Sequence, residues 1–364
     1  MNYDVIIIGA GVSGLLTAIE LTESGAHCCL LDKGLIGQES SWAGGGILSP
    51  LYPWNYPPAV TALATWSQQH YPDYFARLQD ETGIDPQYLS SGHLILGHDK
   101  QAESIAEWAQ RSHSQVDRIE GKELATLEPA LSDHFDHALW LPRVGQVRNP
   151  RFIKALTRRA TQLGITLIEK TKVVEITRHG STVTGIATRK NRLSAAQTLI
   201  SSGAWSALPL GDDIQLPEIE PVKGQMIQFQ TTAGSIRRIS LYRGHYIIPR
   251  QDGKVLAGST LEYTGYDKST DDKSANALRD AAIQLYPSLQ DQPVIDHWAG
   301  LRPGNKRQIP YICPHPRLEN LYFNTGHFRN GIVLGLASAR LCADLMLGRM
   351  PILNAADYAI GESG

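Results

Sequence analysis

The hydrophobic pattern of the first 32 residues predicts a strand, a tight turn, a helix and a second strand. The apolar run 4–8 is followed by the sequence GAGVSG at 9–14, and a helical period of apolar residues then covers 15–24. A second apolar run, 28–31, ends directly at Asp32. Strand, glycine turn, helix, strand and acid follow one another in the order of a nucleotide-binding βαβ unit.

Three glycines and one acid have distinct roles in such a unit. Gly9 permits the tight turn, Gly11 lets the backbone approach a pyrophosphate, and Gly14 lets the helix pack closely on the strand. The helix N-terminus then directs free N–H groups at the phosphates. Asp32 lies 18 residues beyond Gly14, where its carboxylate can accept hydrogen bonds from ribose hydroxyls. A glycine-rich turn without a ligand is the simpler alternative, which the complete order of elements disfavours.

The rest of the chain contains further segments of helical and strand periodicity. Helices are predicted at 59–83, 99–112, 120–127, 150–163, 272–285 and 331–347. Strands are predicted at 165–169, 172–178, 182–189, 198–200, 225–230, 240–249, 254–260, 294–301 and 321–326. Asn149 is expected to cap the helix that begins at Pro150. The pattern predicts one α/β nucleotide domain, built from N- and C-terminal parts, with a mostly antiparallel β-rich part inserted into it.

Composition and charge exclude several classes of protein. The 364 residues carry a formal charge of −2, which is not the basic footprint of a nucleic-acid binder. No apolar run approaches the roughly 20 residues of a transmembrane helix, and the first residues do not resemble a targeting segment. The four cysteines show no metal-ligand spacing. We therefore expect no disulfide bonds, a reducing compartment and a cytoplasmic protein without an integral membrane segment.

Small residues recur at 40–48, in the sequence SSWAGGGIL. Such a cluster is unsuited to a core helix, and it allows a bulky planar ligand to lie against the backbone. Ser40 and Ser41 are then expected to donate to phosphate, whereas a flexible surface loop is the alternative interpretation. The aromatic, proline-rich segment 51–58 fits a lid and a rigid packing loop equally well.

Two arginines and a tyrosine are candidates for binding a small carboxylate. Arg302 ends an apolar strand, and Arg329 lies between a strand and the last helix. A guanidinium in such a place either forms a structural ion pair or holds a carboxylate in two-point geometry. Tyr246 lies in a strand, so its hydroxyl either reaches the same carboxylate or packs within the sheet. The turn 327–332 either stabilises negative charge on a ring, such as that of a reduced flavin, or simply caps the last helix through Asn330.

Other catalytic chemistries find little support in the sequence. The 12 histidines form no HExxH motif and no cluster with metal-ligand spacing. There is also no Cys/His or Ser/His/Asp arrangement with supporting context. The sequence therefore predicts no metal site and gives little support to a hydrolase.

The motifs described above resemble those of the D-amino acid oxidase superfamily of FAD enzymes, most closely the glycine oxidases of thiamine biosynthesis. The resemblance covers essentially the whole chain and rests on the segments 9–14, 40–48, 202–206, 221–225, 246–250, 298–304 and 326–332. It implies an α/β fold with a Rossmann-type FAD-binding domain and a second, mostly antiparallel β substrate-binding domain, which is the D-amino acid oxidase/glutathione-reductase-like fold. We assign 1–50, 145–220 and 320–364 to the FAD-binding domain, and 51–144 and 221–319 to the substrate-binding domain.

The resemblance also assigns roles to individual positions. Arg302 matches the arginine that pairs with the substrate carboxylate, Tyr246 matches its hydroxyl partner, and Arg329 matches a further active-site arginine. Leu261 falls in the pocket wall, where some glycine oxidases have methionine. The positions that match FAD contacts are Gly9, Gly11, Val12, Ser13, Gly14, Asp32, Lys33, Ser40, Ser41, Gly45, Gly46, Ile47, Val173, His327, Phe328, Arg329, Asn330, Gly331 and Ile332.

The resemblance implies that FAD is bound non-covalently. Relatives with covalent flavin use a cysteine shortly before a tyrosine that matches Tyr311. Ile309 occupies that position here, and Cys313 is out of register with it.

The implied reaction is the oxidation of glycine, and of small primary and secondary amino acids, to an imine. Hydride transfer from the neutral amine to the flavin needs no general base with a tuned pKa, which agrees with the lack of an obvious acid/base residue. O2 is then reduced to H2O2. The imine hydrolyses to glyoxylate and ammonia, unless a thiazole synthase captures it for the thiazole of thiamine. A homo-oligomer is compatible with the sequence.

Three alternative functions remain open at this point. The same fold could oxidise D-amino acids or sarcosine, or act as a dehydrogenase that passes electrons to a quinone. A nicotinamide-dependent dehydrogenase is allowed by the first 32 residues alone. A flavin-binding scaffold without turnover is the third alternative, which intact Arg302 and Tyr246 disfavour.

Overall fold

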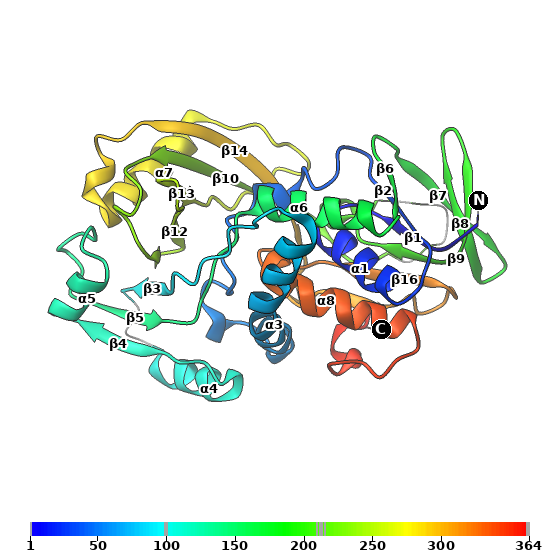
Figure 1. Cartoon of the computed structure of the whole chain (residues 1–364), viewed down its shortest axis with the longest axis horizontal. Coiled ribbons are helices and arrows are strands. Elements are labelled where there is room, and N and C mark those ends of the chain that lie inside the picture. Colours follow the sequence, from blue (N-terminus) through cyan, green and yellow to red (C-terminus); the bar gives the residue numbers. More distant parts are fainter. Residues whose placement is uncertain (1, 98–100, 209, 211–213, 215, 362–364) are drawn as a thin grey trace.

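The computed structural model describes residues 2–97, 101–208, 210, 214 and 216–361. Its strands form two eight-stranded sheets. Figure 1 shows the sheet that contains the N-terminal strand on the right and the other sheet on the left. The chain crosses between the two sheets several times. Segments far apart in sequence therefore meet where the sheets adjoin.

The first sheet has the strand order β15-β16-β9-β1-β2-β6, and the β7–β8 hairpin is joined to it through β9. Its strands are β1 Asn2–Ile8, β2 Cys28–Leu31, β6 Thr166–Ile168, β7 Val173–His179, β8 Thr182–Thr188, β9 Arg192–Ile200, β15 Tyr311–Pro314 and β16 Leu321–Thr325. β1 runs parallel to β2 and β9, and β9 runs parallel to β16. The carboxyl ends of these four strands share one edge, where ligands bind in open α/β sheets.

Helices cover this sheet and build its core. They are α1 Val12–Glu23, α3 Pro58–Thr82, α6 Asn149–Gln162 and α8 Gly331–Met346. Each helix contributes a fully buried side chain to one apolar cluster, namely Leu15, Leu63, Phe152 and Leu341. Complete burial of such a side chain stabilises the fold by about 1.5–3 kcal/mol. This packing holds the α1 N-terminus rigidly at the carboxyl edge of the sheet.

The second sheet is mostly antiparallel, with the order β14-β10-β13-β12-β11-β3-β5-β4. Its strands are β3 His93–Leu96, β4 Asp117–Glu120, β5 His137–Leu141, β10 Glu220–Gln230, β11 Ile239–Tyr242, β12 His245–Pro249, β13 Lys254–Gly258 and β14 Val294–Gly304. Only β3 and β11 pair in parallel among these described strands. The helices α4 Ala102–Ser112, α5 Gly121–Leu127 and α7 Asp272–Leu285 belong to this half. The long strand β14 extends from this sheet toward the first (Figure 1).

The predicted fold class is confirmed, and the strands divide between the two sheets almost as the predicted ranges do. β15 is the exception, because it pairs with β16 in the first sheet although it lies within 221–319. The helix α3 lies within 51–144, yet it packs on α6 and α8 beside the first sheet. The domain boundaries themselves stay a prediction.

Most predicted elements are present, and the differences have local causes. The run 240–249 is two strands, since Arg243 and Gly244 form a turn with φ of 48° and 84°. The short strands β3, β4, β5 and β15 were absent from the prediction. Residues 99 and 100 of the predicted helix 99–112 lie outside the described part of the chain.

Asn149 does not cap α6. Arg148 occupies the N-cap position and Asn149 is already helical. The Asn149 side chain instead donates from Nδ2 to the Ser41 carbonyl oxygen at 2.8 Å. The residue therefore connects α6 to the short helix α2 Ser40–Ala43.

The segment 51–58 is tied down by several contacts. It contains a 3-10 turn, Pro53–Asn55. Trp54 is buried and donates from Nε1 to Gln101 Oε1 at 2.7 Å. The Tyr52 hydroxyl accepts a hydrogen bond from Gly244 N at 3.0 Å. These contacts support the packing-loop interpretation of this segment over the lid.

All four cysteines are free and buried. Across the described ranges, no helix is both long and apolar enough to cross a bilayer.

His93 in β3 is fully buried, and neither ring nitrogen has a hydrogen-bond partner among the described residues. Burial lowers its pKa from 6.5 to about 3, so the unfolded chain binds one more proton between these pH values. The free energy of unfolding therefore falls as the pH drops below about 6.5. We expect His93→Leu to remove this loss. The free energy of unfolding of the variant, relative to that of the native protein, should therefore be higher at pH 5 than at pH 7.5 by on the order of 1–2 kcal/mol. Urea unfolding at both pH values measures this difference, and an equal difference at both would contradict the assignment.

Candidate functional site

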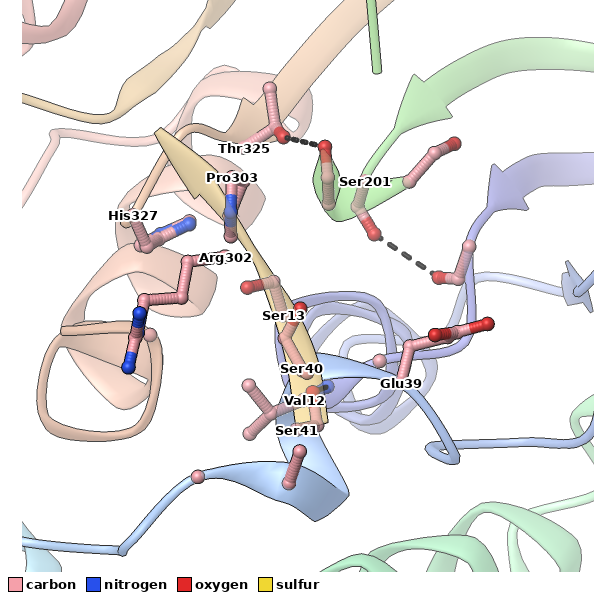
Figure 2. A pocket seen from close by; sticks show the side chains of 18 of the residues that line it. Val12, Ser13, Glu39, Ser40, Ser41, Ser201, Arg302, Pro303, Thr325 and His327 are labelled. Carbon is pink, nitrogen blue, oxygen red and sulfur yellow. Dashed lines mark hydrogen bonds between the residues drawn. The ribbon is translucent and has the colours of Figure 1, made fainter. Parts of the chain in front are cut away.

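A cavity of about 550 Å³ lies where the carboxyl edge of the first sheet meets β12 and β14 of the second. One end is lined by Gly11, Val12 and Asp32, and the other by Tyr246 and Arg302. Figure 2 shows Val12, Ser13, Ser40 and Ser41 grouped at the starts of α1 and α2, with Arg302 and His327 together to their left. The cavity therefore joins the predicted nucleotide turn to the predicted carboxylate site.

The turn after β1 has the backbone geometry that its glycines predict. Gly9 has φ of 107°, and a Cβ there would lie 2.5 Å from the Ser201 carbonyl oxygen. A Cβ at Gly14 would lie 2.0 Å from the carbonyl oxygen of Gly9, so only glycine permits this approach of helix to strand. Gly11, the N-cap residue of α1, has no side chain to cap the helix. The α1 N-terminus therefore presents N–H groups and a positive dipole end toward the cavity.

Asp32 and Ser41 accept hydrogen bonds from backbone N–H groups at this end of the cavity. Asp32 accepts hydrogen bonds from Ala10 N at 2.9 Å and from Gly34 N at 2.8 Å. Carboxylate oxygens keep further lone pairs after such bonds, so Asp32 can still accept from hydroxyl groups. Ser41 Oγ accepts from Val12 N at 2.9 Å and keeps its own proton for donation.

Ser40 differs from the prediction that both serines are free to donate. Its hydroxyl donates to the carbonyl oxygen of Leu301 in β14. The side chain therefore binds the two halves of the molecule together at the cavity wall, next to Arg302.

The segment 44–47 forms a second wall of the cavity. Gly46 has φ of 74°, and a Cβ there would lie 2.1 Å from the Val147 carbonyl oxygen. A Cβ at Gly45 would lie 2.5 Å from Cδ1 of Ile248 and 3.3 Å from Cε2 of Tyr246. These glycines leave a smooth backbone surface facing the cavity, as the predicted planar ligand requires.

Arg302 is placed in β14 by backbone and side-chain acceptors. Its Nη1 donates to the carbonyl oxygens of Lys223 and Thr260 at 3.3 and 3.2 Å, and its Nη2 donates to Ser259 Oγ at 2.7 Å. These bonds use three of the five N–H donors of a guanidinium. Burial lowers the pKa of Arg302, which the Tyr246 side chain beside it partly offsets. The remaining donors of this buried cation are suited to a carboxylate.

Arg329 adds a second positive charge to the cavity. It follows β16 in the loop before α8 and lines the cavity with Arg302. Among the described residues, no carboxylate lies within 4.0 Å of either guanidinium. The charge of Arg329 further lowers the pKa of Arg302. An anionic ligand would relieve this repulsion.

His327 contributes a neutral ring to the same wall. It is buried, and burial lowers its pKa to about 4, so the imidazole is uncharged at neutral pH. Its Nε2 atom has no hydrogen-bond partner among the described residues. An unpaired polar atom in the lining of a cavity is a position for a ligand that can form the missing hydrogen bond.

The structure brings nearly all predicted site residues together. Those that line the cavity are Gly9, Gly11, Val12, Ser13, Asp32, Lys33, Ser40, Ser41, Gly45, Gly46, Ile47, Val173, Tyr246, Arg302, His327, Phe328, Arg329, Asn330, Gly331 and Ile332. Gly14 is not in this lining, since it packs α1 against β1. Leu261 is also outside it, with 48% of its surface exposed. The structure thus offers no support for Leu261 as a pocket wall.

Met226 is a lining residue that the sequence did not single out, whereas Gly224 and Trp205 lie within the motifs 221–225 and 202–206 that carry the resemblance. Met226 and Gly224 in β10 lie at the Tyr246 end, and a Cβ at Gly224 would lie 2.0 Å from Arg302 Nη2. Trp205 lies at the other end, with Lys33 Nζ 3.3 Å from the centre of its ring. The strand and glycine turn at 198–206 are expected to lie beside the first nucleotide turn if they join the same parallel sheet, and the parallel pairing of β1 and β9 confirms this.

No group of three or more His, Cys, Asp or Glu side chains suited to a metal ion occurs in the described ranges.

Comparison with known proteins identifies the family. A family model described as "DAO: FAD dependent oxidoreductase" matches residues 4–345. The chain belongs to this family of FAD-dependent oxidoreductases. The cofactor is therefore FAD, and the nicotinamide alternative is set aside.

Relatives of known name cover the whole chain. Glycine oxidase of Pseudomonas aeruginosa is 46% identical over 99% of both chains, and glycine oxidase of Pseudomonas putida is 43% identical over 99% of this chain and 98% of its own. The bifunctional protein ThiO/ThiG of Trichormus variabilis is 28% identical over 99% of this chain and 55% of its own length. The crystal structure of glycine oxidase from Geobacillus kaustophilus superposes with a TM-score of 0.92 at 27% identity, covering 99% of each chain.

The residues of the cavity fit FAD. The backbone cradle at Gly9 and Gly46 has no room for side chains, and the α1 N-terminus, whose N-cap residue is a glycine, suits a pyrophosphate. Asp32 retains acceptor capacity for ribose hydroxyls, and the unpaired Nε2 of His327 offers a polar contact further along the cavity.

Proposed function

We propose that this protein is a glycine oxidase, which converts glycine and O2 to glyoxylate, ammonia and H2O2. The observation that carries the proposal is that Arg302 and Tyr246 both line one end of the FAD cavity, in a chain 46% identical to a named glycine oxidase. Small primary and secondary amino acids, including sarcosine, are proposed as further substrates.

Arg302 and Tyr246 bind the substrate carboxylate in this proposal. The buried guanidinium supplies N–H donors to the carboxylate oxygens, and the tyrosine hydroxyl supplies one more hydrogen bond. Arg329 adds electrostatic attraction from the opposite loop. With the carboxylate fixed, the α-carbon has a defined position in the cavity, and such positioning is a large part of catalysis when a cofactor performs the chemistry.

Bound FAD supplies the acceptor for the two electrons and the hydrogen that leave the α-carbon. In this proposal the protein binds the amine in its neutral form, because hydride transfer from a neutral amine needs no general base. Two electrons and two protons pass on to O2, which gives H2O2. Water then hydrolyses the imine to glyoxylate and ammonia.

The FAD is proposed to be non-covalent. Cys313 is buried in β15, and burial raises the pKa of its thiol to about 11. A protonated thiol is a poor nucleophile. None of the four cysteines lines the cavity.

The cellular setting is the last part of the proposal. Relatives named ThiO/ThiG join a region similar to this chain to a second region in one protein, which supports delivery of the imine to a thiazole synthase for thiamine. A cytoplasmic location is compatible with four free buried cysteines. Association into a homo-oligomer stays a prediction.

Steady-state rates on glycine, sarcosine, D-alanine and D-proline test the substrate assignment. We expect kcat/KM for glycine or sarcosine to equal or exceed that for D-proline, with stoichiometric H2O2. D-amino acids preferred by orders of magnitude would replace the proposal with a D-amino acid oxidase, and activity only with a quinone would replace the oxidase with a dehydrogenase.

A further inference from the structure

Arg250 is a buried arginine whose side chain binds only neutral acceptors. It follows the last residue of β12 and is 8% exposed. No carboxylate among the described residues lies within 4.0 Å of it, because the nearby Asp252 pairs with Arg148 at 2.9 Å. Burial lowers the pKa of Arg250 to about 9, so the guanidinium stays charged at neutral pH. A buried charge without a counter-charge is costly and calls for a specific role.

The Arg250 guanidinium joins two segments, 45–48 and 145–147, to the end of β12. Nη2 donates to the Gly45 carbonyl oxygen at 2.8 Å, and Nη1 donates to the Val147 carbonyl oxygen at 3.1 Å and to Gln146 Oε1 at 2.7 Å. The segments 45–48 and 145–147 also bind each other, through Val147 N to the Gly46 carbonyl oxygen at 2.9 Å. The Arg250 side chain thus holds both segments, 45–48 and 145–147, which together are called the bridge.

The bridge forms the cavity wall beside the substrate-binding tyrosine. Gly45, Gly46 and Ile47 line the cavity. Gly45 also packs against Tyr246 and Ile248, which belong to the same strand that ends before Arg250. The position of the glycine wall relative to Tyr246 is therefore set at one end by van der Waals contact and at the other by the guanidinium.

We propose that Arg250 is a positioning residue, which fixes the glycine wall of the FAD cavity against the strand that carries Tyr246. A planar fork with several fixed donors can hold two carbonyl groups and an amide at once, whereas the ammonium of lysine is a single point of charge. The fixed positive charge also lies directly behind the wall that faces the cofactor. The expected effect of replacing Arg250 on turnover of glycine rests on the proposed glycine oxidase function. The expected effect on FAD binding does not rest on it.

The test compares holoenzyme variants Arg250→Lys and Arg250→Met with the control Arg148→Met. Arg148 is a neighbouring arginine that pairs with Asp252 and does not line the cavity. FAD affinity, the visible absorption and circular dichroism of the bound flavin, and kcat and KM for glycine are measured for each. We expect both Arg250 variants to weaken FAD binding roughly tenfold or more, as for loss of a charge-assisted hydrogen bond, to change the flavin spectrum and to lower kcat more than they raise KM. The control should stay within twofold.

A purely structural role predicts a lower melting temperature with an unchanged flavin spectrum, FAD affinity and kcat, and that outcome overturns the proposal. If Arg250→Met does not fold, Gln146→Ala decides in its place, because it removes one acceptor and keeps the guanidinium. Wild-type protein that glycine does not reduce would refute the proposed function, while FAD affinity and spectra would still decide the role of Arg250.

Discussion

Replacing Arg302 with leucine is expected to lower kcat/KM for glycine by about 10²- to 10³-fold, which corresponds to roughly 3–4 kcal/mol of lost transition-state binding. The substitution removes the cation that is proposed to pair with the substrate carboxylate. It also leaves Ser259 Oγ and the carbonyl oxygens of Lys223 and Thr260 without their donor. Steady-state peroxide formation measures the loss.

Two controls separate carboxylate recognition from general damage. FAD content and the flavin spectrum of Arg302→Leu should match those of the native protein. Methylamine, which lacks a carboxylate, should be a poor substrate of both proteins with similar kcat/KM. A loss of activity that is as large for methylamine as for glycine, or activity on glycine within threefold of native, would refute the assigned role of Arg302.

Gly46→Ala is expected to abolish stable FAD binding. The new Cβ would lie 2.1 Å from the Val147 carbonyl oxygen, so the segment 45–48 must move away from 145–147 and into the cavity. The strain of placing alanine at φ of 74° adds only about 1 kcal/mol. FAD content after purification and the affinity for added FAD measure the effect.

Gly164→Ala is the matched control for that substitution. Gly164 has φ of 77°, and a Cβ there would meet no atom within 4 Å. The control carries the same backbone penalty without the clash, so it should lose about 1 kcal/mol of stability and keep its FAD. Equal FAD content in the two variants would show that the wall at Gly46 is not part of the cofactor site.

The nucleotide half of the site was predictable because the residues that form it lie in one short segment of the sequence. Gly9, Gly14 and Asp32 occupy a short βαβ unit whose geometry depends on local backbone conformation. The strands β3, β4 and β5 were missed, since each is short, and β3 pairs in parallel with β11, a partner distant in sequence. Local periodicity carries no information about such pairs.

The substrate half of the site depended on resemblance and on tertiary contacts. Nothing near Arg302 in the sequence indicates that Ser259, Thr260 and Lys223 hold its guanidinium. Ser40 was expected to face phosphate, yet its hydroxyl donates a hydrogen bond to the Leu301 carbonyl oxygen in β14. Arg250 belonged to a recognised motif, but its contact with Gly45 appears only when the two halves are assembled.

Anaerobic mixing of the purified holoenzyme with glycine tests the central claim most directly. Glycine is expected to bleach the visible absorption of the oxidised flavin, and admission of air is expected to restore it with one H2O2 per flavin reduced. A yellow protein whose flavin glycine does not bleach at any concentration would contradict glycine oxidation while leaving the fold and the FAD site intact.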